Sequence, residues 1–500
     1  MRKVASTISP LVAVEKGSPH SLQAQIYTAF RHAIVGGSLA AGQRVPSTRV
    51  LAAELRISRM PVMNAYAQLL AEGYFESRVG SGTVVARQLG AALAAAAAPA
   101  PAGNGAPPPA ARNPAARRQV SARCAALPTA DNFHPRRYQG AFTVSQIAFE
   151  HFPLAVWRRL ATRQLRGLGP NALDYGDPMG LRELREAIAA YLRTARGVRC
   201  EPRQVMIVSG SQQGLEIAAR ALLDPGDQVW LEDPGYRFAH SVFLGSGCRV
   251  VPVPVDADGL DVRAGARRCP AARAVLVTPS HQYPLGVTMS ATRRLQLLDW
   301  AESSGGWIIE DDFDSEFRYA GVPITSLQGL DRHDRVVYIG TFSKVLFPAL
   351  RIGYLVVPPD LVERFLAARF AFDLGPATFA QAVLADFVAE GHFARHIRRM
   401  RPVYNERRGA LIASLRRRLG EAVEIVGDQA GIHLAAVVPG CPDRAIYARA
   451  IQEQLTLVPL SIFHLGPNPR QGFVLGFGSV TPAQIAAGVA RLAELLQDSA

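Results

Sequence analysis

Two short helices are predicted near the start of the chain. Between residues 22 and 35, apolar side chains recur every four positions, as expected for one buried helical face. They are Leu22, Ile26, Phe30 and Ile34. Ser47 then stands before another apolar stretch, where its hydroxyl is suited to cap a helix over residues 48–55. The pattern therefore predicts a compact helical region at this end of the chain.

A third helix and a hairpin follow. Ser58 is suited to cap the helix, which is expected to run to about Glu72 and to stop at Gly73. Residues 74–85 combine two β-prone runs with a glycine-rich tip, which predicts a β-hairpin. Two helices joined by a tight turn and followed by a hairpin predict a winged helix-turn-helix over residues 20–87. A small helical interaction domain is the alternative interpretation.

The hydrophobic pattern changes beyond residue 130. Residues 131–500 alternate short β-branched runs with amphipathic stretches. The clearest runs are 204–208, 228–231, 274–278, 306–310 and 336–339. Alternation of strands and helices predicts an α/β fold with a largely parallel sheet.

Residues 88–130 are a low-complexity Ala/Pro/Arg stretch between these two regions. Such a composition cannot bury enough apolar surface to fold, and its prolines stiffen it toward polyproline II. We expect a long, flexible linker. The prolines are Pro99, Pro101, Pro107, Pro108, Pro109 and Pro114.

The net charge of +14 is concentrated at the amino-terminal end, because residues 1–130 carry ten of these positive charges. A basic end favours a polyanionic partner, although a solubilising tail is the alternative. The five cysteines show no paired metal spacing, which fits a reducing compartment. No stretch is long and apolar enough for a signal peptide or a membrane span. We expect a soluble cytoplasmic protein with no membrane partner.

Lys344 is the most unusual residue of the second region. The chain has only three lysines, the others being Lys3 and Lys16, against 52 arginines. A desolvated lysine amine loses its proton and attacks carbonyl carbons, which a guanidinium does not do. A surface lysine without a function is the alternative. The neighbouring sequence, Gly340-Thr341-Phe342-Ser343-Lys344, favours the chemical role.

Several short motifs accompany this lysine in a fixed order. Residues 209–214 (SGSQQG) follow a strand and open a predicted helix over 215–223, which is typical of a phosphate site. Tyr236 follows the next strand and is placed to stack on a planar ligand, although a core tyrosine is equally consistent with it. The residues around His281 end another strand and offer polar contacts. Arg351 lies seven residues after Lys344 and is suited to clamp a phosphate.

Acidic residues follow the predicted strand at 306–310. A carboxylate buried there, such as Asp311, needs a cationic partner, either a protonated pyridine nitrogen or a metal ion. No histidine cluster accompanies these acids along the chain, so we expect no metal. Phosphate cradle, ring stack, buried acid and amine together describe one ligand, pyridoxal phosphate.

The amino-terminal region resembles the winged helix-turn-helix of GntR-type regulators. The resemblance rests on Gln25-Ile26-Tyr27 and on residues 39–55 and 65–74, and it spans nearly the whole region. It implies binding to a double-stranded DNA operator. The residues that it implies contact DNA are Arg49, Ser58, Arg59, Arg78 and Gly80. Two positions depart from the family pattern: Arg56 replaces the usual turn glycine, and Met60-Pro61 replaces a polar pair.

Residues from about 135 onward resemble fold-type I aminotransferases, and with the head and linker the whole chain resembles the MocR subfamily of GntR regulators. The implied fold is multidomain: an α+β head, a flexible linker over 88–130, and an α/β PLP-dependent transferase body over 131–500. The body would divide into a large subdomain at about 170–375 and a small one at about 376–500.

The same resemblance implies a role for each matching residue. Lys344 would hold the cofactor as a Schiff base (the internal aldimine), Asp311 would pair with its pyridine nitrogen and Tyr236 would stack on its ring. The other implied cofactor contacts are Ser211, Gln212, His281, Ser343 and Arg351. Tyr175 resembles the tyrosine that reaches the phosphate bound by a partner subunit, which implies a homodimer.

Two departures weaken the case for turnover. Phe313 lies where many relatives have a tyrosine, and the apolar Val474 lies where aminotransferases commonly place an arginine for the substrate carboxylate. Arg470 and Arg237 are the nearest substitutes. We therefore expect a body that senses pyridoxal phosphate itself, or a small amine or amino acid, through aldimine chemistry at Lys344. An active aminotransferase carrying a DNA-binding domain is the alternative, and a scaffold that has lost its cofactor is a third.

Overall fold

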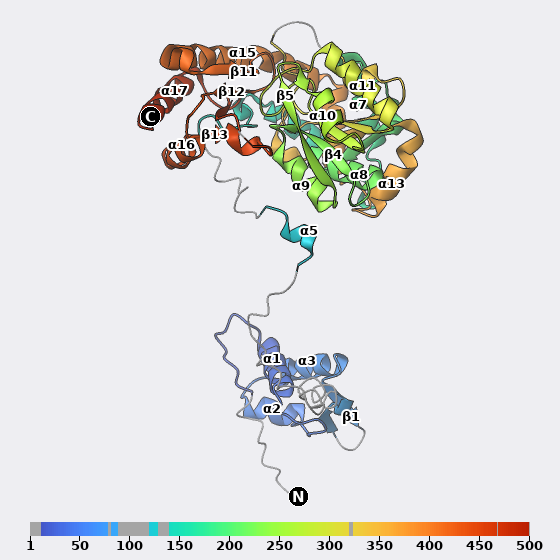
Figure 1. Cartoon of the computed structure of the whole chain (residues 1–500). Helices are drawn as coiled ribbons and strands as arrows, with labels where there is room; N and C mark the ends of the chain where they lie inside the picture. Colours follow the sequence, from blue (N-terminus) through green and yellow to red (C-terminus); the bar gives the residue numbers. More distant parts are fainter. Residues whose placement is uncertain are drawn as a thin grey trace, which may run out of the picture. The chain divides into compact units, whose positions relative to one another are not determined.

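The chain forms two compact units, Met1–Arg117 and Arg118–Ala500, in a computed structural model (Figure 1). The structure describes residues 12–78, 82–88, 120–128, 140–319, 324–467 and 469–499.

Within its described residues, the amino-terminal unit is built from three helices and one hairpin. Its elements are α1 (Leu22–Val35), α2 (Thr48–Glu54), α3 (Arg59–Ala71), β1 (Phe75–Arg78) and β2 (Gly82–Val85). The two strands pair antiparallel. Phe30, Tyr66 and Phe75 pack edge to face, with ring centroids 5.1 to 5.5 Å apart, and join the helices to the hairpin. The predicted winged helix-turn-helix is confirmed.

The turn between α2 and α3 explains one departure from the family pattern. Arg56 has φ of 51°, a left-handed conformation that glycine adopts without strain. An arginine there keeps the turn but bears a conformational cost of about 1–2 kcal/mol. Ser47 caps α2 by accepting a hydrogen bond from the Val50 amide. Ser58 stands at the N-cap position of α3, yet its hydroxyl makes no capping bond.

The carboxy-terminal unit is built on an eight-stranded sheet with the order β3-β10-β9-β8-β7-β4-β5-β6. In that order the strands are Val205–Val208, Gly353–Val356, Val336–Thr341, Trp307–Asp312, Ala274–Val277, Gln228–Asp233, Arg249–Asp256 and Gly259–Leu260. The strands β9, β8, β7, β4 and β5 run parallel, whereas β10 and β6 run antiparallel to their neighbours.

The sheet is largely parallel, as the sequence predicted, and the reversed strands β10 and β6 make it mixed. Only residues 342–352 connect β9 to β10. A parallel crossover needs about a dozen residues or more, usually including a helix, so this connection favours an antiparallel return. The return places Lys344 and Arg351 at the same edge of the sheet.

Helices cover both faces of this sheet. Within β7, Ala274 and Leu276 face one apolar layer, while Val275 and Val277 face the other. Such alternation is expected of strands buried on both sides. The first layer contains α8 (Ser211–Leu222), α9 (Arg237–Gly245) and α13 (Val362–Phe370). The second contains α10 (Val262–Arg268) and α11 (Ala291–Ser304), with α12 (Leu327–Leu330) beside them.

A third apolar cluster joins the large sheet to a smaller antiparallel sheet with the order β11-β12-β14-β13. These strands are Glu424–Val426, His433–Val437, Gly472–Gly476 and Val458–Pro459. The accompanying helices are α6 (Leu154–Arg166), α7 (Arg182–Ala195), α14 (Phe379–Ala389), α15 (His392–Leu419), α16 (Asp443–Ala450) and α17 (Pro482–Gln497). A short helix, α5 (Ala122–Ala125), precedes all of them. None of the helices in the described residues is long and apolar enough to cross a membrane.

Candidate functional site

Three of the candidate DNA-contacting residues, Arg49, Ser58 and Arg59, are exposed on the surface of the amino-terminal unit. Nε of Arg59 donates a 3.1 Å hydrogen bond to the Thr48 hydroxyl. This bond links the start of α2 to the start of α3. Arg78 ends β1, and Gly80 lies outside the described residues. Met60 is 60% exposed, so an apolar side chain stands where relatives carry a polar one.

The main cavity of the carboxy-terminal unit has a volume of about 420 Å³ and lies at the carboxyl ends of the parallel strands. Ligands of α/β proteins bind preferentially at this edge. Seven of the predicted site residues line it together: Ser211, Gln212, Tyr236, Asp311, Ser343, Lys344 and Arg351. They come from five separate parts of the chain, which only the fold brings together.

Lys344 lies in the turn after β9 and opens onto the cavity. Burial lowers the pKa of its amine to about 8, and the nearby carboxylates of Asp314 and Asp311 partly oppose this shift. A larger share of the amine is therefore neutral near physiological pH than for an exposed lysine. The structure gives Lys344 the environment expected of a nucleophilic amine.

Asp311 projects from the end of β8 and is almost fully buried. Burial, followed by the charge of Asp312, raises the pKa of its carboxyl to about 7, and the charge of Lys344 partly opposes this shift. Its Oδ1 atom has no hydrogen-bond partner among the described residues. A buried carboxylate oxygen without a partner is costly, so this geometry favours a ligand that brings a cationic N–H group.

The opposite end of the cavity is suited to an anion. Helix α8 begins at Ser211, four residues earlier than the sequence predicted, so Ser211 and Gln212 form its first turn. The free amides of a helix start attract phosphate. Arg351 adopts a left-handed conformation and donates a 2.7 Å hydrogen bond to the Ser209 carbonyl. The Ser343 hydroxyl is buried without a partner among the residues described.

Gly210 allows this close approach. Its φ of 85° suits glycine, and a Cβ atom there would lie 3.1 Å from the Arg351 guanidinium. A side chain at this position would therefore displace the arginine from the start of α8. Both the positive φ and the close contact with Arg351 explain why position 210 carries a glycine.

Aromatic side chains form the middle of the cavity wall. Tyr236 stands at the N-cap position of α9, and its hydroxyl donates to Oε1 of Gln212 at 3.5 Å. Tyr283 packs edge to face against both Tyr236 and Phe313, at 5.9 Å between ring centroids. Phe313 lines the cavity without the hydroxyl that a tyrosine would supply.

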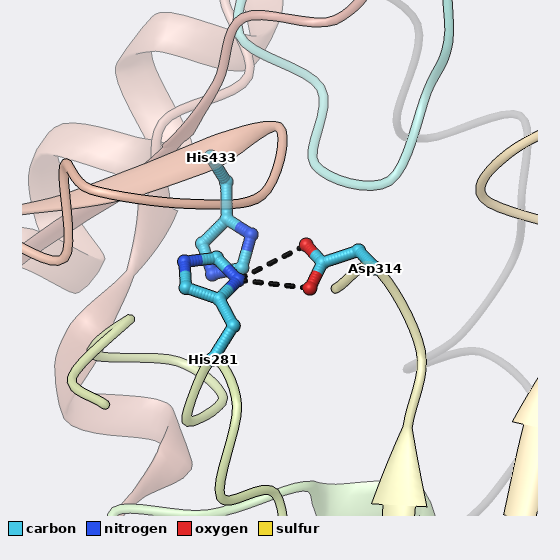
Figure 2. Close-up of side chains that lie close together, drawn as sticks. All are labelled: His281, Asp314 and His433. Atoms are coloured by element: carbon cyan, nitrogen blue, oxygen red, sulfur yellow. Dashed lines mark hydrogen bonds and ion pairs between the residues drawn. The ribbon is translucent and has the colours of Figure 1, made fainter. Parts of the chain in front are cut away.

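His281 is a predicted cofactor contact, but it does not line the cavity. It is buried, and its Nδ1 lies 3.0 Å from both carboxylate oxygens of Asp314 (Figure 2). The ring of His433, from β12, lies 4.6 Å away between centroids. One potential metal-ligand atom from each of the three residues lies within 4.8 Å of the others. The expectation that no histidine cluster accompanies the acids is wrong, because two distant segments supply the histidines.

Tyr175 also lies outside the main cavity. It is 87% exposed and borders a second hollow lined by residues 173–176 and 373–378. The Tyr175 side chain does not line the main cavity of its own subunit.

The position where the resemblance implies a carboxylate-binding arginine carries the apolar Val474. Val474 lies in β14, is fully buried, and packs with Val458 and Phe463. Arg470 instead forms a 3.0 Å ion pair with Glu424. Arg237 does line the cavity.

The sequence interpretation missed four consecutive residues that line the cavity. Residues 143–146 line it, with Ser145 at a φ of 70°. These residues match no short motif, and only their contact with the small sheet places them there. Asp314, which acts on Lys344, was part of the acidic run but was not distinguished from its neighbours.

Comparison with known proteins assigns both units. Residues 22–85 match the family of bacterial regulatory proteins called the gntR family, and residues 141–492 match aminotransferase class I and II. The body resembles the crystal structure of Pyrococcus horikoshii kynurenine aminotransferase in complex with PMP, kynurenine and its product. That match has a TM-score of 0.70 at 28% identity and covers 76% of this chain and 97% of that one. The protein is thus a GntR-type regulator with a fold-type I aminotransferase body.

Relatives that match nearly the whole chain show to which group of GntR-type regulators it belongs. The chain is 39% identical over 482 residues to the probable rhizopine catabolism regulatory protein MocR of Rhizobium meliloti, covering 96% of this chain and 94% of that protein. It is 30% identical over 470 residues to the pyridoxine biosynthesis transcriptional regulator PdxR of Corynebacterium glutamicum, covering 94% of each. The chain belongs to the MocR-type GntR transcriptional regulators, whose homologues combine a DNA-binding head with an aminotransferase-like body.

Proposed function

We propose that the body of this regulator binds pyridoxal phosphate and that the state of this ligand controls DNA binding by the head. The observation that carries the proposal is a pair of buried, unpartnered oxygens in one cavity, Oδ1 of Asp311 and Oγ of Ser343. In the proposed complex, Oδ1 of Asp311 would face the protonated ring nitrogen of the cofactor and Oγ of Ser343 would face its phosphate. Without such a ligand both groups bear a desolvation penalty.

The donor set fits the whole cofactor. The first turn of α8, Ser343 and Arg351 would hold the phosphate, Tyr236 would stack on the ring, and Asp311 would accept from the pyridine nitrogen. When bound, pyridoxal phosphate supplies an electrophilic aldehyde carbon that condenses with amines. Lys344 supplies the protein's amine and competes for that carbon with any amine that enters from solution.

Sensing is favoured over turnover by Val474 and Arg470, at and near the position where a carboxylate-binding arginine is expected. Val474 is buried among apolar side chains, and Arg470 is paired with Glu424, so neither holds a substrate carboxylate. The effector would be the cofactor itself or a small amine or amino acid. The name of PdxR refers to pyridoxine biosynthesis, which suits the cofactor as effector. The name of MocR refers to rhizopine catabolism, which suits a small molecule of that kind as effector.

A titration tests the proposal. The cofactor-free full-length chain is expected to bind one pyridoxal phosphate per subunit, seen as absorbance that remains with the protein after gel filtration. Addition of amino acids should change the spectrum without sustained release of keto acid. Steady keto-acid production across a panel of amino acids would favour the alternative, an active aminotransferase with a DNA-binding head. Failure to retain any cofactor would overturn the proposal.

The exposed Tyr175 supports a homodimer. A tyrosine that is 87% exposed on the surface of one subunit, beside a hollow, is well placed to enter the site of a second subunit. In the proposed dimer it would reach the partner's bound phosphate. Operators read by two heads would then contain two half-sites.

The rate at which the cofactor-free chain captures pyridoxal phosphate should rise with pH through about 8, because burial lowers the pKa of Lys344 to that value. Only the deprotonated amine attacks, so the rate should fall about tenfold for each pH unit below the pKa. Rapid-mixing absorbance measures it. Asp314→Asn removes the largest influence that raises this pKa and should move the midpoint lower. A midpoint near the ordinary lysine pKa of 10.5 would contradict the assigned environment of the amine.

Arg59→Ala should weaken specific DNA binding by about tenfold or more and reduce its salt dependence by about one counterion. Arg59 is exposed at the first position of α3, where its guanidinium, bonded to Thr48 through Nε, would reach phosphates or guanine edges through its Nη atoms. Binding isotherms at several salt concentrations measure both effects. Arg31→Ala, which removes the same charge from α1, is the matched control. Unchanged footprints for Arg59→Ala would exclude α3 as the recognition helix.

A further inference from the structure

The end of the linker lies against the body. Residues 120–128 contain α5, whose N-cap Ser121 accepts a 3.2 Å hydrogen bond from the Cys124 amide. This helix contacts α9. Leu127 is the one residue of the segment that is half-buried, and all the others are exposed.

Two glycines at the carboxyl end of α9 provide the contact surface. A Cβ atom at Gly245 would lie 3.9 Å from Cδ2 of Leu127, and one at Gly247 would lie 3.6 Å from Cδ of Arg123. Because neither position carries a side chain, the linker approaches the helix end closely. The contact is small and rests mainly on one leucine.

The other end of α9 belongs to the cavity. Tyr236 stands at its N-cap position, and Arg237 and Phe238 line the cavity wall. Nε2 of Gln212 donates a 3.0 Å hydrogen bond to the Phe238 carbonyl, which ties this first turn to the start of α8. Helix α9 has nine residues and is therefore about 13 Å long. One rigid element thus contacts the candidate cofactor site at one end and the linker at the other.

We propose that α9 is the relay between the cavity and the DNA-binding head: occupation of the cavity shifts α9, and this shift changes the docking of residues 120–128 on its far end. The proposal rests on the proposed function, because it takes pyridoxal phosphate as the occupant. Docking shortens the free linker, and release lengthens it, so the reach of the head depends on the ligand.

The weakness of the contact suits this role. A ligand shifts an equilibrium between two states only by its differential affinity for them. A segment held by one half-buried leucine has docked and released states of similar free energy. A modest displacement of α9 is therefore enough to change which state is more populated. The same segment buried in a large apolar interface would stay docked whatever the ligand did.

Cys124 reports the docking directly. It is exposed on α5, whereas the other four cysteines, Cys200, Cys248, Cys269 and Cys441, are buried. The rate at which a thiol reagent modifies Cys124 in the full-length protein should differ several-fold between the cofactor-free and pyridoxal-phosphate-loaded forms. Cys124→Ser should remove the fast-reacting thiol and so confirm its assignment. Equal rates in the two forms would overturn the proposal.

A pair of variants separates this relay from the cofactor proposal. Leu127→Asp should leave pyridoxal phosphate binding unchanged, make Cys124 modification independent of the ligand, and abolish the effect of pyridoxal phosphate on DNA affinity. Val120→Asp, at a position of the same segment that is 64% exposed, should behave as wild type. A full response to pyridoxal phosphate in Leu127→Asp would overturn the relay alone. Absence of cofactor binding in the wild type would overturn the proposed function and the relay with it.

Discussion

Replacing Lys344 with alanine is expected to abolish stable retention of pyridoxal phosphate. The phosphate and ring contacts proposed for Ser211, Arg351 and Tyr236 remain in this variant, so some reversible binding should persist. What disappears is the amine that holds the aldehyde carbon. After gel filtration the wild type should retain the cofactor and the variant should not.

Lys344→Arg is the matched control, because arginine carries a positive charge on a side chain of similar length but does not condense with an aldehyde. If charge alone holds the cofactor, Lys344→Arg should retain it as the wild type does. If condensation holds it, both variants should lose it. Borohydride reduction of the loaded wild type, followed by peptide mass analysis, should locate the added mass on the peptide that contains Lys344. Retention of the cofactor by Lys344→Ala after gel filtration would contradict the assignment.

Replacing Arg196 with methionine is expected to destabilise the body by about 3–5 kcal/mol, the usual result of removing one partner from a buried ion pair. Arg196 and Asp312 are both almost fully buried, and their nearest atoms are 2.8 Å apart. The guanidinium also donates to the Ile324 carbonyl and the Ser280 hydroxyl. Asp312 accepts a 2.6 Å hydrogen bond from the Tyr338 hydroxyl. Without the arginine, a carboxylate remains buried next to Asp311.

Denaturant unfolding followed by a probe of the body measures this loss. Arg182→Met is the control, because Arg182 forms a 2.7 Å ion pair with Glu186 in which the arginine side chain is 80% exposed. That variant should change stability by about 1 kcal/mol or less. The double variant Arg196→Met/Asp312→Leu should recover much of the loss, since it leaves no unpaired charge. If Arg196→Met and Arg182→Met had the same free energy of unfolding, the ion pair of Arg196 would not contribute the expected stability.

The sequence predicts local elements well where one periodicity dominates. The helix over 22–35 has the predicted bounds, because its apolar residues repeat at one spacing and Ser21 caps it. The start of α8 was misplaced because Gly214 was taken as part of a turn. Gly214 lies inside the helix, where a Cβ atom would be 3.2 Å from Leu355 of β10. The glycine serves packing between helix and sheet, and a single sequence does not distinguish that use from a turn.

The candidate site was predictable only in part, for a similar reason. Asp311, Ser343 and Lys344 follow strands and therefore meet at one edge of a parallel sheet. The position of His281 follows instead from Asp314 and from Gly431, where a side chain would overlap the His281 ring. Asp314 lies 33 positions after His281 along the chain, whereas Gly431 comes from the distant segment before β12. The contact with Gly431 depends on how the small sheet packs on the large one, which local pattern does not specify.

The measurement that tests the central claim most directly is the affinity of the full-length protein for DNA with and without pyridoxal phosphate. The DNA would be a fragment selected by the wild type from a random library, and the comparison would include Lys344→Ala. The account predicts that the cofactor changes wild-type affinity by about fivefold or more, a typical allosteric coupling, and leaves the variant unaffected. Equal wild-type affinities with and without bound cofactor would contradict it.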